Sequence, residues 1–239
     1  MRPKVTVVIP FYNCRYIAHA LESVLQQTYR PIEIIVVDDG SNEHVELLQP
    51  YKTHIRYIRK SNGGTATALN AGIQAASGDY IAWLSSDDVF YKDKVAKQLD
   101  FMLANQAVFS FTDYDVLYQQ TGQIQHRVMP QFTSTVDVAR SFIDECRING
   151  CTVMLHKQML QQTGLFDESM PYAHDYDFWV RILLSGIRPY FLKESLTLYR
   201  WHPEMGSIKY NAQQMNEFAQ AKQKYRDPLF HYIQNCRIP

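Results

Sequence analysis

Residues 34–41, Ile-Ile-Val-Val-Asp-Asp-Gly-Ser, constrain the fold more than any other segment of the chain. Four consecutive β-branched apolar residues predict a strand that is buried on both faces, as in a parallel sheet. The strand runs directly into Asp38, Asp39 and a glycine turn. Ligands of open α/β sheets bind beyond the carboxyl ends of the strands, so acids at this point are placed to contact a ligand. The same residues are equally typical of a solvated turn in which Asp38 or Ser41 caps the next helix.

The first predicted strand covers residues 5–9, and the turn that follows it limits which kind of ligand can bind. It reads Pro10-Phe11-Tyr12-Asn13. A Rossmann dinucleotide site needs glycines here so that the backbone can approach a pyrophosphate, and a P-loop needs glycines followed by Lys and Ser or Thr. The chain has neither pattern. Its rigid, aromatic and hydrogen-bonding turn suits a base or a ribose better than a phosphate.

Charge and cysteine content limit the class of protein. With 24 Lys plus Arg against 24 Asp plus Glu, the chain has no overall field that would attract nucleic acid or a membrane surface. No apolar run approaches the roughly 20 residues that span a bilayer, and no signal peptide precedes the first strand. The cysteines lack zinc-like spacing, which favours a reduced, cytoplasmic protein. They are Cys14, Cys146, Cys151 and Cys236.

Predicted strands and helices alternate through the first half of the chain. The strands are residues 5–9, 32–37, 55–59, 80–84 and 108–112, and the helices are residues 16–27, 43–48, 65–76 and 92–105. This alternation predicts an α/β fold with a Rossmann-like, doubly wound and mainly parallel sheet.

The second half has a different pattern. The sequences of residues 115–118 and 124–128 predict a hairpin. We therefore expect a small antiparallel section in this half of the sheet. The further elements are helices at 136–145 and 175–184 and strands at 151–156, 190–192 and 196–201. We therefore expect one domain over residues 1–207, with a nucleotide-binding half to about residue 112 and an acceptor and catalytic half from about residue 113. Residues 208–239 are expected to form a partly helical tail packed on it.

A second acidic edge follows the fourth predicted strand, which ends in Ser85-Ser86-Asp87-Asp88. A carboxylate beside a pyrophosphate is unfavourable unless a divalent cation lies between them. Asp87 and Asp88 therefore suggest a site for Mg²⁺ or Mn²⁺. The alternative is that these two acids cap the helix that follows.

Short motifs recur along the chain in an order that is typical of one enzyme family. They are residues 8–13 (VIPFYN), 23–28 (SVLQQT), 37–41 (VDDGS), 62–64 (NGG), 68–72 (ALNAG), 78–81 (GDYI), 84–88 (LSSDD), 164–168 (GLFDE), 175–181 (DYDFWVR) and 199–202 (YRWH). In this order they resemble family 2 of the inverting nucleotide-sugar glycosyltransferases, which have the A-type (GT-A) fold. The resemblance extends to about residue 207.

The resemblance implies a donor site at the turn after the first strand and the acids after the second, which hold uracil and ribose in that family. The matching residues are Pro10, Phe11, Tyr12 and Asp39. Asp39 is then the expected partner of the ring N–H of the base, whereas Asp38 is expected to be structural. Asn62 and Gly63, followed by Gly64, would let the backbone pass close to the nucleotide. Asn70 is expected either to face the same pocket or to support helix packing.

The resemblance also implies a metal site. The metal motif of the family is Asp-x-Asp, and here Ser85 replaces its first acid. Asp87 matches the acid that contacts the metal, so it is expected to bind Mg²⁺ or Mn²⁺ together with the donor diphosphate. His202 matches a position that reaches the metal or the diphosphate, with a structural histidine as the alternative. The replacement at Ser85 bears on how strongly the metal binds.

Asp175 is the catalytic residue that the resemblance implies. In the family, the Asp of a Glu-Asp pair at a helix start is the general base for the acceptor hydroxyl, and His174 replaces that Glu here. The alternative for Asp175 is a charge that complements the helix dipole. Asp177 and Arg181 predict an ion pair on the helix surface. Trp179 is expected in the core, with stacking on an acceptor sugar as the alternative.

The predicted function is therefore an inverting glycosyltransferase that moves a sugar from a nucleotide diphosphate, best a UDP-sugar, to an acceptor hydroxyl. A bacterial surface polysaccharide is the expected product, with a glycan or lipid-linked glycan as acceptor. A lipid-linked acceptor would bring a cytoplasmic enzyme to the inner face of the membrane. One alternative is a non-catalytic nucleotide-sugar-binding module, which the replacements at Ser85 and His174 keep open. The other is a sugar-1-phosphate nucleotidyltransferase, which the turn at residues 10–13 disfavours.

Overall fold

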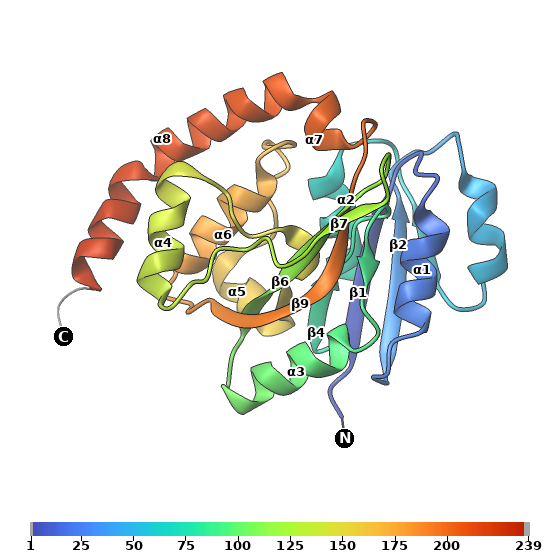
Figure 1. Cartoon of the computed structure of the whole chain (residues 1–239), viewed down its shortest axis with the longest axis horizontal. Coiled ribbons are helices and arrows are strands. Elements are labelled where there is room, and N and C mark those ends of the chain that lie inside the picture. Colours follow the sequence, from blue (N-terminus) through green and yellow to red (C-terminus); the bar gives the residue numbers. More distant parts are fainter. Residues whose placement is uncertain (1, 237–239) are drawn as a thin grey trace.

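Within residues 2–236, which the computed structural model describes, nine strands form one mixed sheet. The strand order is β3-β2-β1-β4-β8-β6-β9-β5, and β7 pairs with β6. Figure 1 shows helices on both faces of this sheet. The predicted α/β, doubly wound fold class is therefore confirmed.

The half of the sheet built from the first strands is parallel. β1 (Val5–Phe11) lies between β2 (Ile32–Asp38) and β4 (Tyr80–Trp83), and β3 (Arg56–Arg59) flanks β2. The Val, Ile and Phe residues of β1 are fully buried, as expected for a central strand covered on both faces. Because these strands are parallel, the carboxyl ends of β1, β2 and β4 meet at one edge of the sheet.

Alternate side chains of β1 face two separate cores. Val7 packs with α1 (Ile17–Leu25) and α3 (Lys94–Ala104) on one face. Val8 packs with α2 (Thr65–Ala75) on the other face. A Cβ added to Gly72 of α2 would come within 2.3 Å of a methyl group of Val8. The glycine therefore lets α2 lie directly on the sheet.

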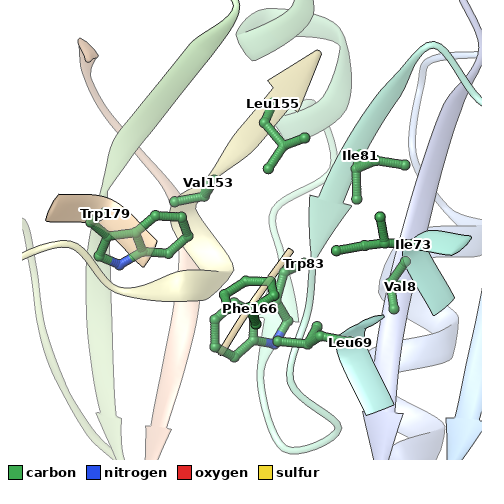
Figure 2. A pocket seen from close by; sticks show the side chains of 9 residues that line it. All are labelled: Val8, Leu69, Ile73, Ile81, Trp83, Val153, Leu155, Phe166 and Trp179. Carbon is green, nitrogen blue, oxygen red and sulfur yellow. The ribbon is translucent and has the colours of Figure 1, made fainter. Parts of the chain in front are cut away.

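A small apolar void lies in the core on the α2 side. Its volume is about 10 Å³, and the residues that line it are Val8, Leu69, Ile73, Ile81, Trp83, Val153, Leu155, Phe166 and Trp179. Figure 2 shows these side chains surrounding the void, with Trp83 and Phe166 close together. Because such a volume holds about one water-sized sphere and the lining is apolar, the void is a packing imperfection and not a ligand site.

The second half of the sheet is mostly antiparallel. Its strands are β5 (Val89–Phe90), β6 (Phe109–Tyr118), β7 (Gln123–Gln125), β8 (Met154–His156) and β9 (Tyr190–Trp201). β8 is antiparallel to β4 and β6, β7 to β6, and β5 to β9, whereas β6 and β9 are parallel. The hairpin predicted at residues 115–118 and 124–128 forms between β6 and β7, but β7 ends at Gln125, and the strand predicted separately at residues 108–112 is part of β6.

The prediction of two short strands at residues 190–192 and 196–201 is wrong, because both belong to the single strand β9. The polar residues 193–195 that separate them remain in the strand. β9 carries extra residues there, and the pairing with β6 shifts register between Thr112 and Asp115 to accommodate them. The polar segment therefore marks a bulge and not a strand end.

Two other predicted elements are altered by 3-10 turns. The strand expected at residues 151–156 begins only at Met154, because Gly150–Thr152 forms a 3-10 turn. Asn149 holds this turn by accepting a hydrogen bond from the Cys151 amide at 2.8 Å. The short helix expected at residues 43–48 is a 3-10 helix, Val45–Tyr51.

The last described segment is one long helix. After α4 (Thr135–Asp144), α5 (Leu160–Thr163), α6 (His174–Leu184) and α7 (Gly206–Lys209), the 25-residue helix α8 (Asn211–Asn235) arches over α6 and α4 (Figure 1). Its buried residues Ala221, Tyr225, Leu229 and Ile233 recur every four positions, as for one face of a helix. Residues 237–239 of the predicted tail lie outside the described residues. Over residues 2–236, no helix combines the length and the apolar character needed to cross a bilayer.

The expected surface ion pair in α6 is buried. Asp177 has no exposed side-chain surface and pairs with Arg181 at 2.7 Å. It also accepts hydrogen bonds from Lys224 at 3.0 Å and Tyr225 at 2.5 Å, both on α8. The prediction failed because the sequence does not indicate that α8 covers this face of α6.

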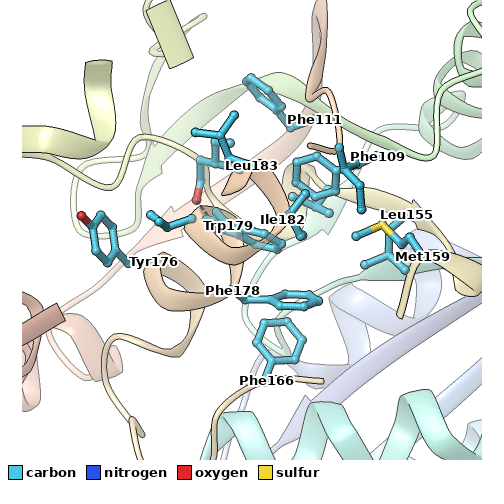
Figure 3. Packing of buried hydrophobic residues seen from close by; sticks show 14 of the residues in the cluster. Phe109, Phe111, Leu155, Met159, Phe166, Tyr176, Phe178, Trp179, Ile182 and Leu183 are labelled. Atoms are coloured by element: carbon cyan, nitrogen blue, oxygen red, sulfur yellow. Dashed lines mark hydrogen bonds between the residues drawn. The ribbon is translucent and has the colours of Figure 1, made fainter. Parts of the chain in front are cut away.

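Trp179 is 2% exposed and packs in the aromatic core shown in Figure 3, so its side chain cannot stack on an acceptor.

Candidate functional site

The predicted site segments converge on the carboxyl edge of the sheet. β1 lies between β2 and β4, so the turn at residues 10–13 is flanked by the acids that follow β2 and β4. His202 follows the end of β9 and lies 3.1 Å from Asp87. Segments more than 100 residues apart in the chain therefore meet at one place.

Asp39 forms a buried clamp for the glycine turn that begins α2. Its carboxylate is 3% exposed and accepts hydrogen bonds from the amides of Gly63 at 3.0 Å and Gly64 at 2.7 Å. Lys60, which was not singled out from the sequence, forms an ion pair with the same carboxylate at 2.6 Å and also donates to Thr67. The acid therefore fixes the backbone at residues 62–64, which the sequence predicted to pass close to a nucleotide.

The glycine at position 40 allows the two loops of this clamp to approach. Gly40 has a φ of +80°, and a Cβ there would lie 2.9 Å from the Asn62 amide nitrogen. A larger residue would be strained and would push the loops apart. Asn62 and Gly63 themselves are exposed at the mouth of the site.

Asp38 has the structural role expected for it. It is fully buried, and its carboxylate accepts a hydrogen bond from the Ser41 amide at 2.7 Å and another from the Tyr57 hydroxyl. Burial, followed by this hydrogen bond to Asp38, raises the pKa of Tyr57 to about 12. Asp38 therefore stabilises the turn itself, and the alternative that Asp38 or Ser41 caps the next helix is wrong, because that helix begins at Val45 with His44 at its N-cap.

The three turn residues assigned to the nucleotide differ in accessibility. The side chain of Tyr12 is 49% exposed, whereas that of Phe11 is fully buried in the core. Pro10 is half-buried. The Phe11 carbonyl already accepts a hydrogen bond from the Asp39 amide at 2.8 Å. Tyr12 is thus the aromatic side chain of this turn that a ligand can reach.

Asp87 and His202 form a polar pair beyond the end of β4. Asp87 Oδ2 lies 3.1 Å from His202 Nε2, and the two side chains are 23% and 7% exposed. The other ring nitrogen of His202 is buried without a hydrogen-bond partner. Tyr16 packs edge-on against this imidazole, with ring centres 5.1 Å apart. The pair is the part of the acidic edge that remains open to a ligand.

Asp88 is a structural acid. It is 1% exposed, and its carboxylate accepts hydrogen bonds from the Arg200 amide at 2.8 Å and the Cys151 thiol at 3.0 Å. Burial, together with the nearby charge of Asp87, raises the pKa of Asp88 well above its ordinary value. Asp88 therefore joins the segment after β4 to β9, and of these two acids Asp87 is the one whose carboxylate is partly exposed.

Ser85, which replaces the first acid of the metal motif, is hydrogen-bonded to the Cys151 thiol, which also contacts Asp88. Its hydroxyl lies 3.2 Å and its amide 3.1 Å from Cys151 Sγ. No group of three or more His, Cys, Asp or Glu side chains that could hold a metal occurs between residues 2 and 236. Asp87 and His202 offer one oxygen and one nitrogen, which fits a cation that takes its remaining ligands from a diphosphate. They do not form a complete protein cage.

Arg200 is a cation beside this pair that was not predicted as a site residue. It is 6% exposed, and its guanidinium donates to the Asp87 carbonyl at 2.8 Å and lies 4.6 Å from the Tyr16 ring centre. In the sequence, the indication that Arg200 belongs to the site was its position within the motif of residues 199–202.

Asp175 lies in the first turn of α6. It is half-buried, and one carboxylate oxygen accepts a hydrogen bond from the Tyr176 amide at 2.8 Å. The other lies 3.9 Å from the Cys146 thiol. Burial, and then the charge of Asp175, raises the pKa of Cys146 well above its usual value, so the thiol stays neutral. Asp175 therefore has an oxygen that is held only by a weak donor.

His174 connects Asp175 to the rest of the site. The imidazole is 8% exposed, and its Nδ1 lies 3.1 Å from the Pro171 carbonyl. Its ring lies 5.8 Å from that of Trp83, the last residue of β4. A Cβ on Gly64 would lie 3.7 Å from Pro171. The loop before Asp175 is thus in contact with both the Asp39 clamp and β4.

Asn70 supports helix packing. Its amide donates to the Phe166 carbonyl and to Glu168, each at 2.9 Å, and accepts from the Phe166 amide at 3.0 Å. The packing alternative for Asn70 is therefore correct, and the residue fixes the loop that follows Gly164.

The chain is similar to known glycosyltransferases over most of its length. A family model described as "Glycosyl transferase family 2" matches residues 6–163. An uncharacterized glycosyltransferase of Rickettsia prowazekii is 38% identical over 84% of this chain and 64% of its own length. The putative teichuronic acid biosynthesis glycosyltransferase TuaG of Bacillus subtilis is 34% identical over 83% of the chain and 79% of its own length. The chain thus spans just under two thirds of the Rickettsia relative.

A third relative has a more specific name. It is the UDP-Glc:alpha-D-GlcNAc-diphosphoundecaprenol beta-1,3-glucosyltransferase WfaP of Escherichia coli, which is 30% identical over 87% of this chain and 80% of its own length. Among solved structures, S. aureus TarS 1–349 in complex with UDP-GlcNAc matches with a TM-score of 0.72 and 19% identity, over 91% of this chain and 66% of TarS. This likeness confirms the GT-A type of fold.

Proposed function

Because this chain belongs to glycosyl transferase family 2, we propose that it transfers a sugar from a UDP-sugar to an acceptor hydroxyl with inversion at the anomeric carbon. One observation carries the proposal. The Asp39 clamp and the Asp87–His202 pair lie at the same edge of the sheet, and the loop that leads to Asp175 contacts this edge at Gly64 and at Trp83.

The nucleotide end of the donor binds at the Asp39 clamp. Tyr12 offers an exposed aromatic face for the base, next to the backbone of Pro10 and Phe11. Asn62 and Gly63 are exposed beside it, and the carboxylate of Asp39 holds them in place. The Asp39 carboxylate already receives four hydrogen-bond contacts, from Lys60, Gly64 and, at both oxygens, Gly63, so the ring N–H of a base would take the place of the longer Gly63 contact at 3.2 Å. UDP as the nucleotide is supported by the UDP and UDP-GlcNAc complexes of TarS.

The diphosphate end binds at the Asp87–His202 pair. Asp87 Oδ2 and His202 Nε2 would hold Mg²⁺ or Mn²⁺, with diphosphate oxygens as the other ligands. When bound, the cation neutralises the negative charge that develops on the departing diphosphate. Arg200 lies behind this pair and fixes it by donating to the Asp87 carbonyl.

Asp175 is the general base. It takes the proton of the acceptor hydroxyl while that oxygen forms a bond to the anomeric carbon. The bond from this carbon to the diphosphate oxygen breaks at the same time, and UDP leaves with the electron pair. One base and a single displacement invert the configuration of the sugar.

The context of the reaction follows from the relatives. TuaG and WfaP are named for teichuronic acid biosynthesis and for transfer to a diphosphoundecaprenol-linked sugar. A glycan or lipid-linked glycan of a bacterial surface polysaccharide is therefore the acceptor in this proposal. Such an acceptor would place the enzyme in the cytoplasm, at the inner face of the membrane.

The second candidate is a nucleotide-sugar-binding module without turnover, which Ser85 and His174 favour because they replace two acids of the family pattern. A panel of nucleotide sugars separates the two functions. We expect UDP-sugars alone to raise the melting temperature, more so with Mn²⁺, and slow release of UDP into water to accompany binding. Stabilisation without any UDP release would favour the binding module. Stabilisation by another nucleotide class would refute UDP as the donor nucleotide.

A further inference from the structure

Glu217 of the C-terminal helix binds the backbone immediately before α6. Its carboxylate oxygen Oε2 accepts hydrogen bonds from the amides of Tyr172 and Ala173, both at 2.6 Å. These amides precede the first residue of α6 by two residues and one residue. Asp175 is the second residue of the same helix. A side chain from α8 therefore holds the start of the helix that carries the proposed base.

This contact places an acceptor and a negative charge at a helix start where the local sequence supplies no side-chain cap. The residue before α6 is Ala173, whose methyl group cannot accept a hydrogen bond from the first turn. Amide groups at a helix start have no partner within the helix, and the helix dipole favours a negative charge there. Hydrogen bonds from two amides to one carboxylate are also stronger than neutral ones. Glu217 thus binds the Ala173 amide, which is one of these unpartnered groups, together with the preceding Tyr172 amide, and places a negative charge at the start of α6.

Further contacts with the α6 segment lie on both sides of Glu217, from Tyr210, which immediately precedes α8, and from α8 itself. Tyr210 packs on Tyr172 with ring centres 5.3 Å apart, and Phe218 packs edge-on against Tyr176 at 4.7 Å. Within the first turn of α6, Asp177 is bound by Lys224. The two helices are therefore joined at several points, of which Glu217 is the one that contacts the backbone next to Asp175.

We infer that Glu217 is a positioning residue for Asp175: by fixing the amides of Tyr172 and Ala173, it sets where the first turn of α6 presents the base to the acceptor hydroxyl. The inference rests on the proposed function. It assigns a catalytic consequence to the C-terminal helix, which lies outside the segment that the family model matches. Glu217 itself contacts neither the Asp39 clamp nor Asp87, so we expect its loss to lower turnover more than donor affinity.

The test compares Glu217→Ala, Glu217→Gln and two controls. Glu217→Gln keeps an acceptor oxygen without the charge. Lys224→Met weakens the contact between α8 and α6 at a side chain other than Asp175, and Asn216→Ala changes an exposed neighbour. Each variant is measured for melting temperature, UDP affinity, turnover at saturating donor and hydrogen exchange of the amides at Tyr172 and Ala173.

For Glu217→Ala we expect exchange at these two amides to speed up by about tenfold or more and turnover to fall by a similar factor, with a much smaller change in UDP affinity. Glu217→Gln should recover part of both losses, and the two controls should keep parent turnover. Faster exchange with parent turnover would overturn the inference, as would equal turnover losses in Glu217→Ala and Lys224→Met. A parent protein that binds UDP but never releases it from a UDP-sugar would instead refute the proposed function.

Discussion

Asp87 Oδ2 lies 3.1 Å from His202 Nε2, although 115 residues separate them in the chain. Asp87 follows β4 and His202 follows β9, so their pairing depends on the whole sheet. Ser85 contacts the Cys151 thiol and Asp88 is buried, which leaves Asp87 as the accessible carboxylate of this edge. The proposed metal site is therefore a two-residue site that requires the diphosphate.

We expect Mn²⁺ to strengthen UDP binding and Asp87→Asn to remove most of that gain. An oxygen ligand without charge holds a cation poorly, so the metal affinity measured at fixed UDP should fall on the order of tenfold or more. Ser85→Asp should tighten metal binding because it adds a second carboxylate beside Asp87. Isothermal titration of Mn²⁺ in the presence of UDP measures both effects. A UDP affinity that is the same with and without metal, in parent and variant alike, would remove Asp87 and His202 from the metal site.

The Asp39 clamp gives a prediction that joins stability to binding. In Asp39→Asn the Lys60 ammonium loses its counter-charge and the amides of Gly63 and Gly64 lose a charged acceptor. Breaking a buried ion pair costs about 3 kcal/mol, so we expect urea unfolding to show a loss of that size and UDP to bind more weakly. Lys60→Met should be milder, because Asp39 keeps its two amide partners.

The control is the comparison of the two stability losses, which should be larger in Asp39→Asn than in Lys60→Met. Equal losses of stability would show that the ion pair, and not the amide contacts, supports the loop. A stability loss in Asp39→Asn with parent UDP affinity would leave Asp39 as a structural residue only.

Lys94 provides a prediction about pH that is independent of catalysis. Its side chain is fully buried. The ammonium donates a long hydrogen bond to the Val153 carbonyl at 3.4 Å and lies 4.5 Å from the Phe90 ring centre. Burial lowers the pKa of Lys94 from 10.5 to about 7. The unfolded chain therefore binds more protons than the folded one between these two values, and the stability of the fold rises with pH across this window.

Lys94→Met removes that titration and nearly conserves the volume. We expect a gain in the free energy of unfolding on the order of 4 kcal/mol at pH 7, which shrinks to less than about 1 kcal/mol at pH 10. Urea unfolding of both proteins at pH 7, 8.5 and 10 measures the difference. A gain that does not change with pH would mean that Lys94 keeps its ordinary pKa in the fold.

The parts of the fold that follow from local pattern were predictable from the sequence. β1 and β2 are rich in apolar β-branched residues, and the position of Asp39 beyond the end of β2 follows directly from such a run. The single strand β9 was not predictable, because polar residues 193–195 resemble a turn unless the bulge against β6 is known.

The parts of the site that depend on distant contacts were not predictable. The local sequence of α6 is typical of a surface position at Asp177, and only the packing of α8 buries it. Glu217 and Lys60 carry no motif, since their function depends on which backbone amides or carboxylates come near them in space. Phe11 was assigned to the nucleotide as part of the aromatic turn, yet the alternation of β1 directs its side chain into the core.

The central claim is that Asp175 acts as the general base of an inverting transfer, and Asp175→Asn tests it most directly. The amide keeps the shape of the side chain and can still accept the Tyr176 amide hydrogen, but it cannot take a proton. The measurement is turnover of the UDP-sugar at saturating donor, with UDP affinity determined in parallel and Asp144→Asn as an exposed control. We expect parent UDP affinity and a loss of turnover on the order of 10²–10⁴, because a base acts only in the transition state. Turnover at the parent rate would contradict the claim and would show that Asp175 only complements the dipole of α6.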